Sequence, residues 1–187
     1  MNLYIVRHAI AVQRGTPGYD DDSQRPLTDA GRKKMKKIVK GLYGLDLGFD
    51  AILTSPYVRA RDTAKILAKG FEMKNQVAFS DNLIPPGNFE KLIQEIHEKY
   101  DVNSLALVGH EPMLSGLISW LTTGNTDMRL TLKKGGVAYL STDNLYQDGR
   151  ATLEWLLTPA LLVKLLQYIG TRKRTRVSRG SQTSFVV

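Results

Sequence analysis

The 187-residue sequence contains no cysteine, so it cannot form a disulfide, a thiol nucleophile or a thiolate metal site. It also lacks any stretch near the roughly 20 apolar residues that a membrane-spanning helix needs. Its N-terminal apolar run, residues 1–6, is too short for a signal peptide and has no basic flank before it. From these absences we expect a cytoplasmic protein that makes no contact with a membrane.

Positive charge is distributed unevenly along the chain, whose net charge is +8. The C-terminal segment, residues 171–187, has no acid and carries five basic residues, namely Arg172, Lys173, Arg174, Arg176 and Arg179. We favour a solvated, disordered tail over a basic arm for nucleic acid, because a handful of charges is weak evidence for nucleic-acid binding. The sequence thus predicts one domain over residues 1–170 and a basic, disordered tail over residues 171–187.

Strand-like and helix-like segments alternate along the domain. Apolar, β-rich runs predict strands over residues 3–6, 51–53, 77–79, 105–108, 137–140 and 152–156. Helical spacing and start signals predict helices over residues 28–43, 55–70, 88–99 and 159–168, with another opening at Pro112. This order predicts a three-layer α/β/α fold with a mostly parallel sheet, in which the last two strands form an antiparallel edge.

Two histidines and two arginines are expected at one edge of this sheet. Arg7 and His8 end the first strand, His110 ends the fourth, and Arg59 follows Ser55 by one helical turn. In sheets of this class, ligand sites form at the carboxyl ends of the strands. Burying so many cationic groups in one crevice is costly unless an anion lies among them. The pattern therefore indicates a phosphate site.

Three segments at these strand ends resemble the histidine phosphatase superfamily. Arg7-His8-Ala9 is similar to its first signature, whose usual third residue is Gly, and residues 55–64 resemble its S-P-x-x-R-A-x-x-T-A pattern. Residues 108–112, Val-Gly-His-Glu-Pro, resemble the segment with the second histidine. Within the superfamily, residues 25–31 and 155–159 are similar to the small phosphohistidine phosphatases of the SixA-like subgroup. The likeness covers residues 1–168 and implies a phosphoglycerate-mutase-like fold.

The resemblance implies that His8 is the nucleophile and that Arg7, Arg59 and His110 hold the phosphoryl oxygens. No metal ion or cofactor is needed. The chemistry agrees, since a neutral imidazole with an ordinary pKa of about 6.5 is nucleophilic and arginine matches phosphate oxygens in two-point fashion. Ser55 either adds a donor near the anion or is a plain helix N-cap, and both interpretations stay open.

The loop after the third strand departs from the superfamily pattern. Many members carry a glutamate there that protonates an alkoxide leaving group, whereas residues 81–87 place a proline at that point. Such a general acid contributes about 10²- to 10⁴-fold in rate. Imidazole leaves easily without it, so the sequence favours a histidine-phosphorylated protein as substrate, a phosphorelay or phosphotransfer carrier in signal transduction.

Glu111 supports an alternative. The acid phosphatases of the superfamily use an acidic residue directly after the second histidine as proton donor, which would make this chain a phosphatase of small phosphate monoesters. Equally, Glu111 is a first-turn residue facing the helix dipole. A non-catalytic module that binds phosphohistidine or nucleic acid is the third hypothesis. The acidic cluster Asp20, Asp21 and Asp22 lacks the spacing of a calcium loop, so we interpret it as solvated.

Overall fold

The protein is built around a single β-sheet. The computed structural model describes residues 1–73, 76–143, 145 and 150–168. Within these residues six strands pair in the order β3-β2-β4-β1-β5-β6. Their bounds are β1 Asn2–Arg7, β2 Ala51–Thr54, β3 Val77–Phe79, β4 Ser104–Gly109, β5 Val137–Ser141 and β6 Thr152–Leu157. β1 to β4 run parallel, whereas β5 is antiparallel to both β1 and β6. The mostly parallel sheet with an antiparallel edge is confirmed.

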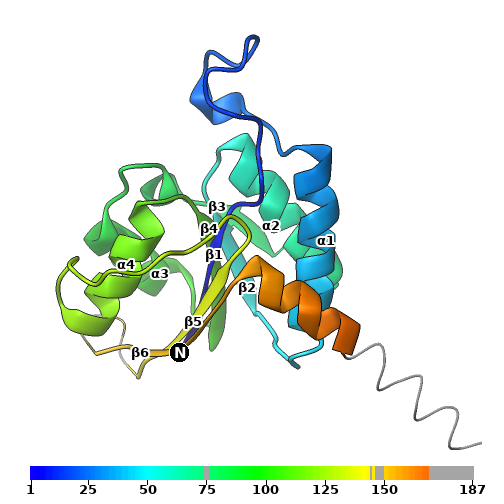
Figure 1. The fold of residues 1–187 in the computed structure, drawn as a ribbon. Coiled ribbons are helices and arrows are strands. Elements are labelled where there is room, and N and C mark those ends of the chain that lie inside the picture. Colours follow the sequence, from blue (N-terminus) through cyan, green and yellow to red (C-terminus); the bar gives the residue numbers. More distant parts are fainter. Residues whose placement is uncertain (74–75, 144, 146–149, 169–187) are drawn as a thin grey trace, which may run out of the picture.

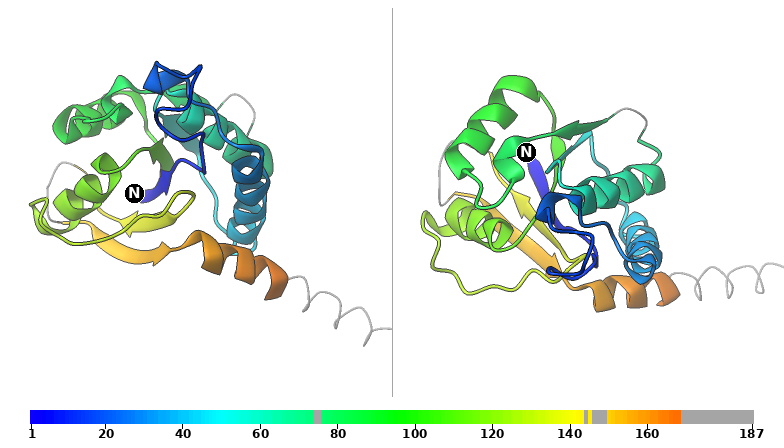
Figure 2. Two further views of the ribbon diagram at one scale, coloured as in Figure 1. Left: turned by 45° about the horizontal axis from the view of Figure 1, so that its top comes forward. Right: turned by 90° about the horizontal axis from the view of Figure 1, so that it is seen from above.

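Helices cover both faces of the sheet, as Figures 1 and 2 show. α1 (Asp29–Tyr43) and α2 (Val58–Gly70) pack on one face, and α3 (Phe89–Lys99) and α4 (Met113–Thr123) pack on the other. Residues 159–168 are also helical and lie beside α1. The three-layer α/β/α arrangement follows, as the strand and helix pattern predicts.

Successive side chains of β1 alternate between the two faces of the sheet, so this one strand contributes to both hydrophobic clusters. Tyr4 and Val6 pack into the cluster under α1 and α2, while Leu3 and Ile5 pack into the cluster under α3 and α4. Successive side chains of a strand point to opposite faces, so a strand buried on both faces is apolar throughout. β1 therefore lies inside the sheet, next to β4 and β5, and its carboxyl end is held from both sides.

The helices begin close to the predicted positions, with one correction. Thr28 caps α1 by accepting a hydrogen bond from the Gly31 amide. Ser55 does not cap α2, because that helix begins at Val58 and the N-cap position belongs to Tyr57. Two residues of turn separate Ser55 from the helix, so its hydroxyl is placed over the end of the sheet. The interpretation of Ser55 as a plain N-cap is therefore wrong.

Two predictions concern the C-terminal tail and the membrane. The boundary at residue 170 and the basic tail over residues 171–187 lie outside the described residues, which end at 168. In the described part of the chain, no helix combines the length and apolarity required to cross a membrane.

Candidate active site

The parallel pairing of β1 with β4 brings the two histidines together. Arg7 lies opposite Gly109 in the register, so His8 and His110 follow the ends of neighbouring strands. The His8 amide donates to the Gly109 carbonyl over 3.0 Å, and the two imidazole centroids are 5.1 Å apart. Only 7% of His8 and 2% of His110 are exposed. The two rings thus share one buried pocket at the carboxyl end of the sheet.

The His8 ring is held in one orientation. Its Nδ1 lies 2.8 Å from the Ala9 carbonyl oxygen, and because a carbonyl only accepts, Nδ1 must donate. The backbone beside it is also fixed, since the Gly135 amide donates to the carbonyls of both Arg7 and His8. Gly135 has a φ of +79°, a left-handed conformation that favours glycine. In the neutral ring the lone pair therefore remains on Nε2, the atom available for attack.

Ser55 and Tyr57 hold the second histidine. The Ser55 hydroxyl oxygen accepts from the Tyr57 amide over 3.3 Å, and the same hydroxyl forms a hydrogen bond of 2.9 Å with His110 Nε2. The Tyr57 ring meets His110 edge-on with centroids 5.2 Å apart. The sequence did not single out Tyr57 because it occupies a variable position of the second motif.

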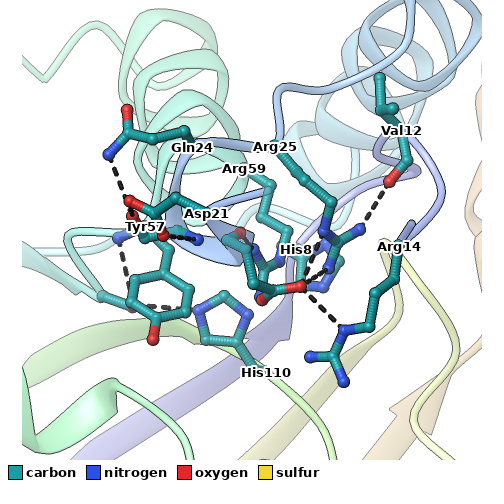
Figure 3. A network of polar contacts seen from close by, with 12 residues as sticks. His8, Val12, Arg14, Asp21, Gln24, Arg25, Tyr57, Arg59 and His110 are labelled. Atoms are coloured by element: carbon teal, nitrogen blue, oxygen red, sulfur yellow. Dashed lines mark hydrogen bonds and ion pairs between the residues drawn. The ribbon is translucent and has the colours of Figure 1, made fainter. Parts of the chain in front are cut away.

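Arg59 enters the same pocket from the second residue of α2, and its side chain is held by Asp22. Its Nη1 donates to the Asp22 carbonyl over 2.6 Å and its Nη2 to the Asp22 carboxylate over 2.8 Å. The guanidinium also lies 4.9 Å from the centre of the Tyr57 ring. Figure 3 shows this network, in which the same carboxylate also binds Arg14 and Arg25.

The interpretation of the acidic cluster as a purely solvated loop is wrong for Asp22. The loop between β1 and α1, which includes the 3₁₀ helix η1 (Asp22–Gln24), folds over the start of α2 and places this carboxylate on a buried arginine. Burial pulls the Asp22 pKa upward, but hydrogen bonds from Arg14 and Arg25 and the charge of Arg59 hold it well below its usual range. The available sequence signal was the three-residue spacing of Asp22 and Arg25.

Three buried nitrogen atoms of the pocket have no hydrogen-bond partner among the described residues: the donors Arg7 Nε and Arg59 Nε, and His110 Nδ1. Arg7 does use its Nη1, which donates to the Leu132 carbonyl over 2.8 Å. An unpaired buried donor costs about 1–3 kcal/mol. A bound phosphoryl group would supply acceptors for the two arginine hydrogens and would place negative charge beside both guanidinium groups.

Burial and positive charge keep both histidines neutral in the pocket. Burial, together with the charges of Arg59 and Arg7, lowers the pKa of His8 to about 3. The same two causes, burial first and then Arg59, lower the pKa of His110 to about 2. His8 therefore presents an unprotonated nitrogen at neutral pH, the form that is nucleophilic.

Glu111 is the carboxylate that directly follows His110. Its Oε2 accepts from the Ser115 hydroxyl over 2.6 Å, while its Oε1 is buried with no partner among the described residues. The loop after β3, which contains η2 (Asp81–Leu83), places its acid elsewhere, in a groove with Lys91 and Glu95 of α3. Nowhere in the described part of the chain do three metal-binding side chains gather around a point.

The fold is shared with solved phosphatases. A structure of the protein histidine phosphatase SixA complexed with tungstate superimposes with a TM-score of 0.74 at 24% identity, covering 87% of this chain and 99% of that one. The α-ribazole phosphatase of Shigella flexneri gives 0.66 at 18% identity, covering 85% and 97%. These similarities define an α/β phosphatase fold that serves more than one substrate.

The sequence identifies the family. Residues 3–101 match the histidine phosphatase superfamily (branch 1), and the chain belongs to that superfamily. An uncharacterised protein of Picosynechococcus sp. is 38% identical over 139 residues, covering 73% of this chain and 82% of that one. The phosphohistidine phosphatase SixA of Escherichia coli is 24% identical over 165 residues, covering 87% and 96%. The protein is thus a phosphatase of this superfamily with a SixA-like relationship.

Proposed function

We propose that this protein is a phosphohistidine phosphatase that removes phosphate from a histidine-phosphorylated protein through a covalent phospho-His8 intermediate. The observation that carries the proposal is the set of unpaired buried donors around an oriented, neutral imidazole. Arg7, Arg59 and His110 would bind the phosphoryl oxygens, with Ser55 and Asp22 positioning two of these side chains. No metal ion or cofactor takes part.

The reaction has two displacements. First, the Nε2 lone pair of His8 attacks phosphorus and the phosphorus–nitrogen bond of the substrate breaks. The substrate ring, which carries a hydrogen on its other nitrogen, keeps the electron pair and departs as neutral imidazole. Second, a water oxygen attacks phosphorus and the bond to Nε2 breaks; inorganic phosphate leaves with both hydrogens of the water, while His8 regains its lone pair as a neutral imidazole. The arginine guanidinium groups stabilise the negative charge on the equatorial oxygens in both steps.

The choice of a nitrogen-bound phosphoryl group rests on the missing acid. The loop over residues 81–87 carries no carboxylate toward the histidines, since its acid Asp81 lies in the groove with α3. Imidazole, with an ordinary pKa of about 6.5, leaves without strong protonation, whereas an alkoxide does not. The relationship to E. coli SixA supports the same substrate. A phosphorelay or phosphotransfer carrier in cytoplasmic signal transduction is the partner that fits.

The direct test follows phosphate release from a histidine-phosphorylated carrier protein and from phosphoserine, in the wild type and in His8→Ala. We expect fast release from the carrier, slow release from phosphoserine, and no release by the variant. Circular dichroism confirms that the variant is folded. Activity that survives in His8→Ala would refute the nucleophile, and a wild type inactive on both substrates would favour a non-catalytic binding module.

A second candidate, a phosphatase of small monoesters, is favoured by the unpaired Oε1 of Glu111. A protonated carboxyl there would deliver its hydrogen to an alkoxide leaving group. Glu111→Gln keeps the shape and removes the acid. A loss of about 10²- to 10⁴-fold on phosphoserine alone would support the second candidate, whereas equal and small losses on both substrates would exclude Glu111 as the acid.

A further inference from the structure

A groove lined by basic side chains opens beside Arg7, at the carboxyl end of β1. Its volume is about 470 Å³, and its lining includes Arg7, Lys34, Lys133 and Lys134 but no acidic residue. Apolar and small side chains, among them Pro159, complete its wall. Arg7 directly precedes His8 in the chain, so the groove lies next to the candidate active site.

A second groove of about 400 Å³ extends the first along α1. It shares Lys34 and Pro159 with the first groove and adds Lys33 and Lys37 to the lining. Together the two form what we call the lysine groove, which contains Lys33, Lys34, Lys37, Lys133 and Lys134. Its extent along a helix face exceeds what a single phosphoryl group would occupy.

Close packing makes the lysine groove a preformed surface. Gly41 of α1 lies directly against the backbone of Leu162 in the helix over residues 159–168. A Cβ at Gly135, just after Lys134, would approach Ile38 of α1 to 2.9 Å and Pro159 to 3.9 Å. The three segments that supply the walls are therefore held in contact, and no large rearrangement is required to form the groove.

No carboxylate in the described part of the chain neutralises the positive charge of the lysine groove. All five lysines are exposed, and none forms an ion pair with a carboxylate in the described part of the chain. The facing helix over residues 159–168 contains no acid and one further lysine, Lys164. Surface cations elsewhere behave differently, for example Lys99, which pairs with Glu95. A groove lined by charges of one sign raises the local concentration of ligands of the opposite charge.

We propose that the lysine groove docks an acidic segment of the phosphorylated protein, an inference that rests on the proposed function. Lys134 lines the groove and directly precedes Gly135, whose amide donates to the carbonyls of Arg7 and His8, so this end of the groove lies beside the backbone of the nucleophile. An extended chain with glutamates or aspartates beside its phosphohistidine would lay them along α1 while the phosphoryl group enters between Arg7 and Arg59. The groove thereby distinguishes carriers by the charge around the phosphohistidine.

The test assays each enzyme variant on each of several substrates that differ in charge. The groove variant carries Lys33→Gln, Lys34→Gln and Lys37→Gln, and the matched control carries Lys36→Gln, Lys40→Gln and Lys65→Gln at exposed positions outside the groove. The substrates are two phosphohistidine peptides of equal length, one with flanking glutamates and one with glutamines, and free phosphohistidine. The measured quantity is kcat/KM for each pair at low and at physiological salt.

We expect the groove variant to lose about tenfold in kcat/KM on the glutamate peptide at low salt and less at physiological salt. Its kcat/KM on the glutamine peptide and on free phosphohistidine should change less than about twofold, as should that of the control on all three. Equal values for the two peptides with the wild type, or equal losses in the groove and control variants, would overturn the docking role and leave the proposed function intact.

Two other outcomes would also overturn it. If the wild type hydrolyses none of the three phosphohistidine substrates, the proposed function fails and the docking role fails with it. If the groove variant instead loses binding to single-stranded DNA or to phosphatidylserine vesicles while the peptide values stay equal, the lysine groove serves a different polyanion.

Discussion

At the scale of single residues, the two buried histidines tie stability to pH. Their pKa values, about 3 for His8 and about 2 for His110, lie far below the ordinary value that the unfolded chain would show. The unfolded state therefore binds more protons wherever the pH lies between these values and about 6.5. Above that range, the protonation of these histidines does not reduce the free energy of unfolding. As the pH drops through the range, the free energy of unfolding falls.

We predict a loss of about 2 kcal/mol per histidine in the free energy of unfolding between pH 7.5 and pH 5, at about 1.4 kcal/mol per pH unit below 6.5. His110→Gln should remove its share of this loss, and bound inorganic phosphate should reduce the loss in the wild type. Denaturant titrations at several pH values measure it. The wild-type slope in His110→Gln would contradict the prediction.

Asp22 is the residue whose role only the folded chain reveals, and it can be tested as a positioning residue. Asp22→Asn removes the charge that faces Arg59 but leaves the backbone carbonyl that accepts from Nη1. We predict a stability loss of about 1–3 kcal/mol, typical of a hydrogen bond to a charged group. The inhibition constant of inorganic phosphate should also rise about tenfold, because a guanidinium displaced from its bound geometry loses two-point contact with phosphate oxygens.

The control for Asp22 is Arg14→Gln. Arg14 contacts the same carboxylate, but its side chain is 80% exposed, so its removal should change stability by less than about 0.5 kcal/mol and leave phosphate inhibition unchanged. An Asp22→Asn enzyme that is less stable but inhibited normally by phosphate would limit Asp22 to a structural role.

At the scale of secondary-structure elements, the first turn of α1 fixes the segment that follows the nucleophile. A Cβ at Gly31 would overlap the Ile10 carbonyl oxygen, so only glycine permits this close approach. Ile10 lies two residues beyond His8, and its carbonyl accepts from the Thr28 amide over 3.0 Å. The helix thereby contacts the backbone that orients the imidazole.

We predict that Gly31→Ala destabilises the protein by about 1–3 kcal/mol, although alanine is the better helix former, because the added methyl must displace backbone. The kcat on phosphohistidine should fall as well, since residues 9–10 move with the helix. Gly48→Ala is the matched control, because no atom lies within 4 Å of the position that its added methyl group would take. That control should be neutral within about 0.5 kcal/mol. Equal effects in thermal unfolding would contradict the prediction.

The element boundaries show what local sequence predicts well. Thr28 was recognisable as an N-cap because a short polar side chain precedes an apolar period of helical spacing, and it accepts the expected amide hydrogen bond. The helix predicted from Asn88 likewise begins there, and Asn88 caps it by accepting from the Lys91 amide. Ser55-Pro56 shows the same local pattern, but the prediction that Ser55 caps the next helix is wrong. The chain needs two further residues to turn from β2 into α2. A cap signal is local, whereas the hydroxyl's actual partner, His110, is 55 residues away.

At the scale of the whole molecule, the helix that follows β6 contributes to the core on one face of the sheet. Leu162 is fully buried and Leu165 packs against the cluster under α1 and α2, so the helix over residues 159–168 finishes that face of the sheet. We therefore propose that the domain ends near residue 170, as the sequence predicts, and that its core does not depend on the residues beyond.

We accordingly predict that deletion of residues 171–187 changes the free energy of unfolding by less than about 0.5 kcal/mol and leaves kcat/KM on free phosphohistidine unchanged. Chemical denaturation and phosphate-release assays of the shortened chain measure both. A steeply salt-dependent affinity for nucleic acid that disappears with the deletion would instead support a binding role for the tail.

The sequence by itself determined the alternation of strands and helices, the mostly parallel sheet and the placement of Arg7, His8 and His110 at strand ends. These follow from periodicities and stop signals that act within a few residues, and from the rule that parallel strands end at one edge. The family resemblance rested on the same short segments, which explains why it was recognisable without the fold. The chemical roles assigned to these side chains stay predictions for the variants above.

Only the tertiary structure decided which groups meet across long separations. Asp22 reaches Arg59 across 37 residues, and Ser55 reaches His110 across 55. Such contacts depend on how loops fold over a finished sheet, where many polar partners compete, and no local pattern selects among them. The unpaired donors and the lysine groove arise in the same way, because burial and an absent counter-charge are properties of the assembled molecule rather than of any segment.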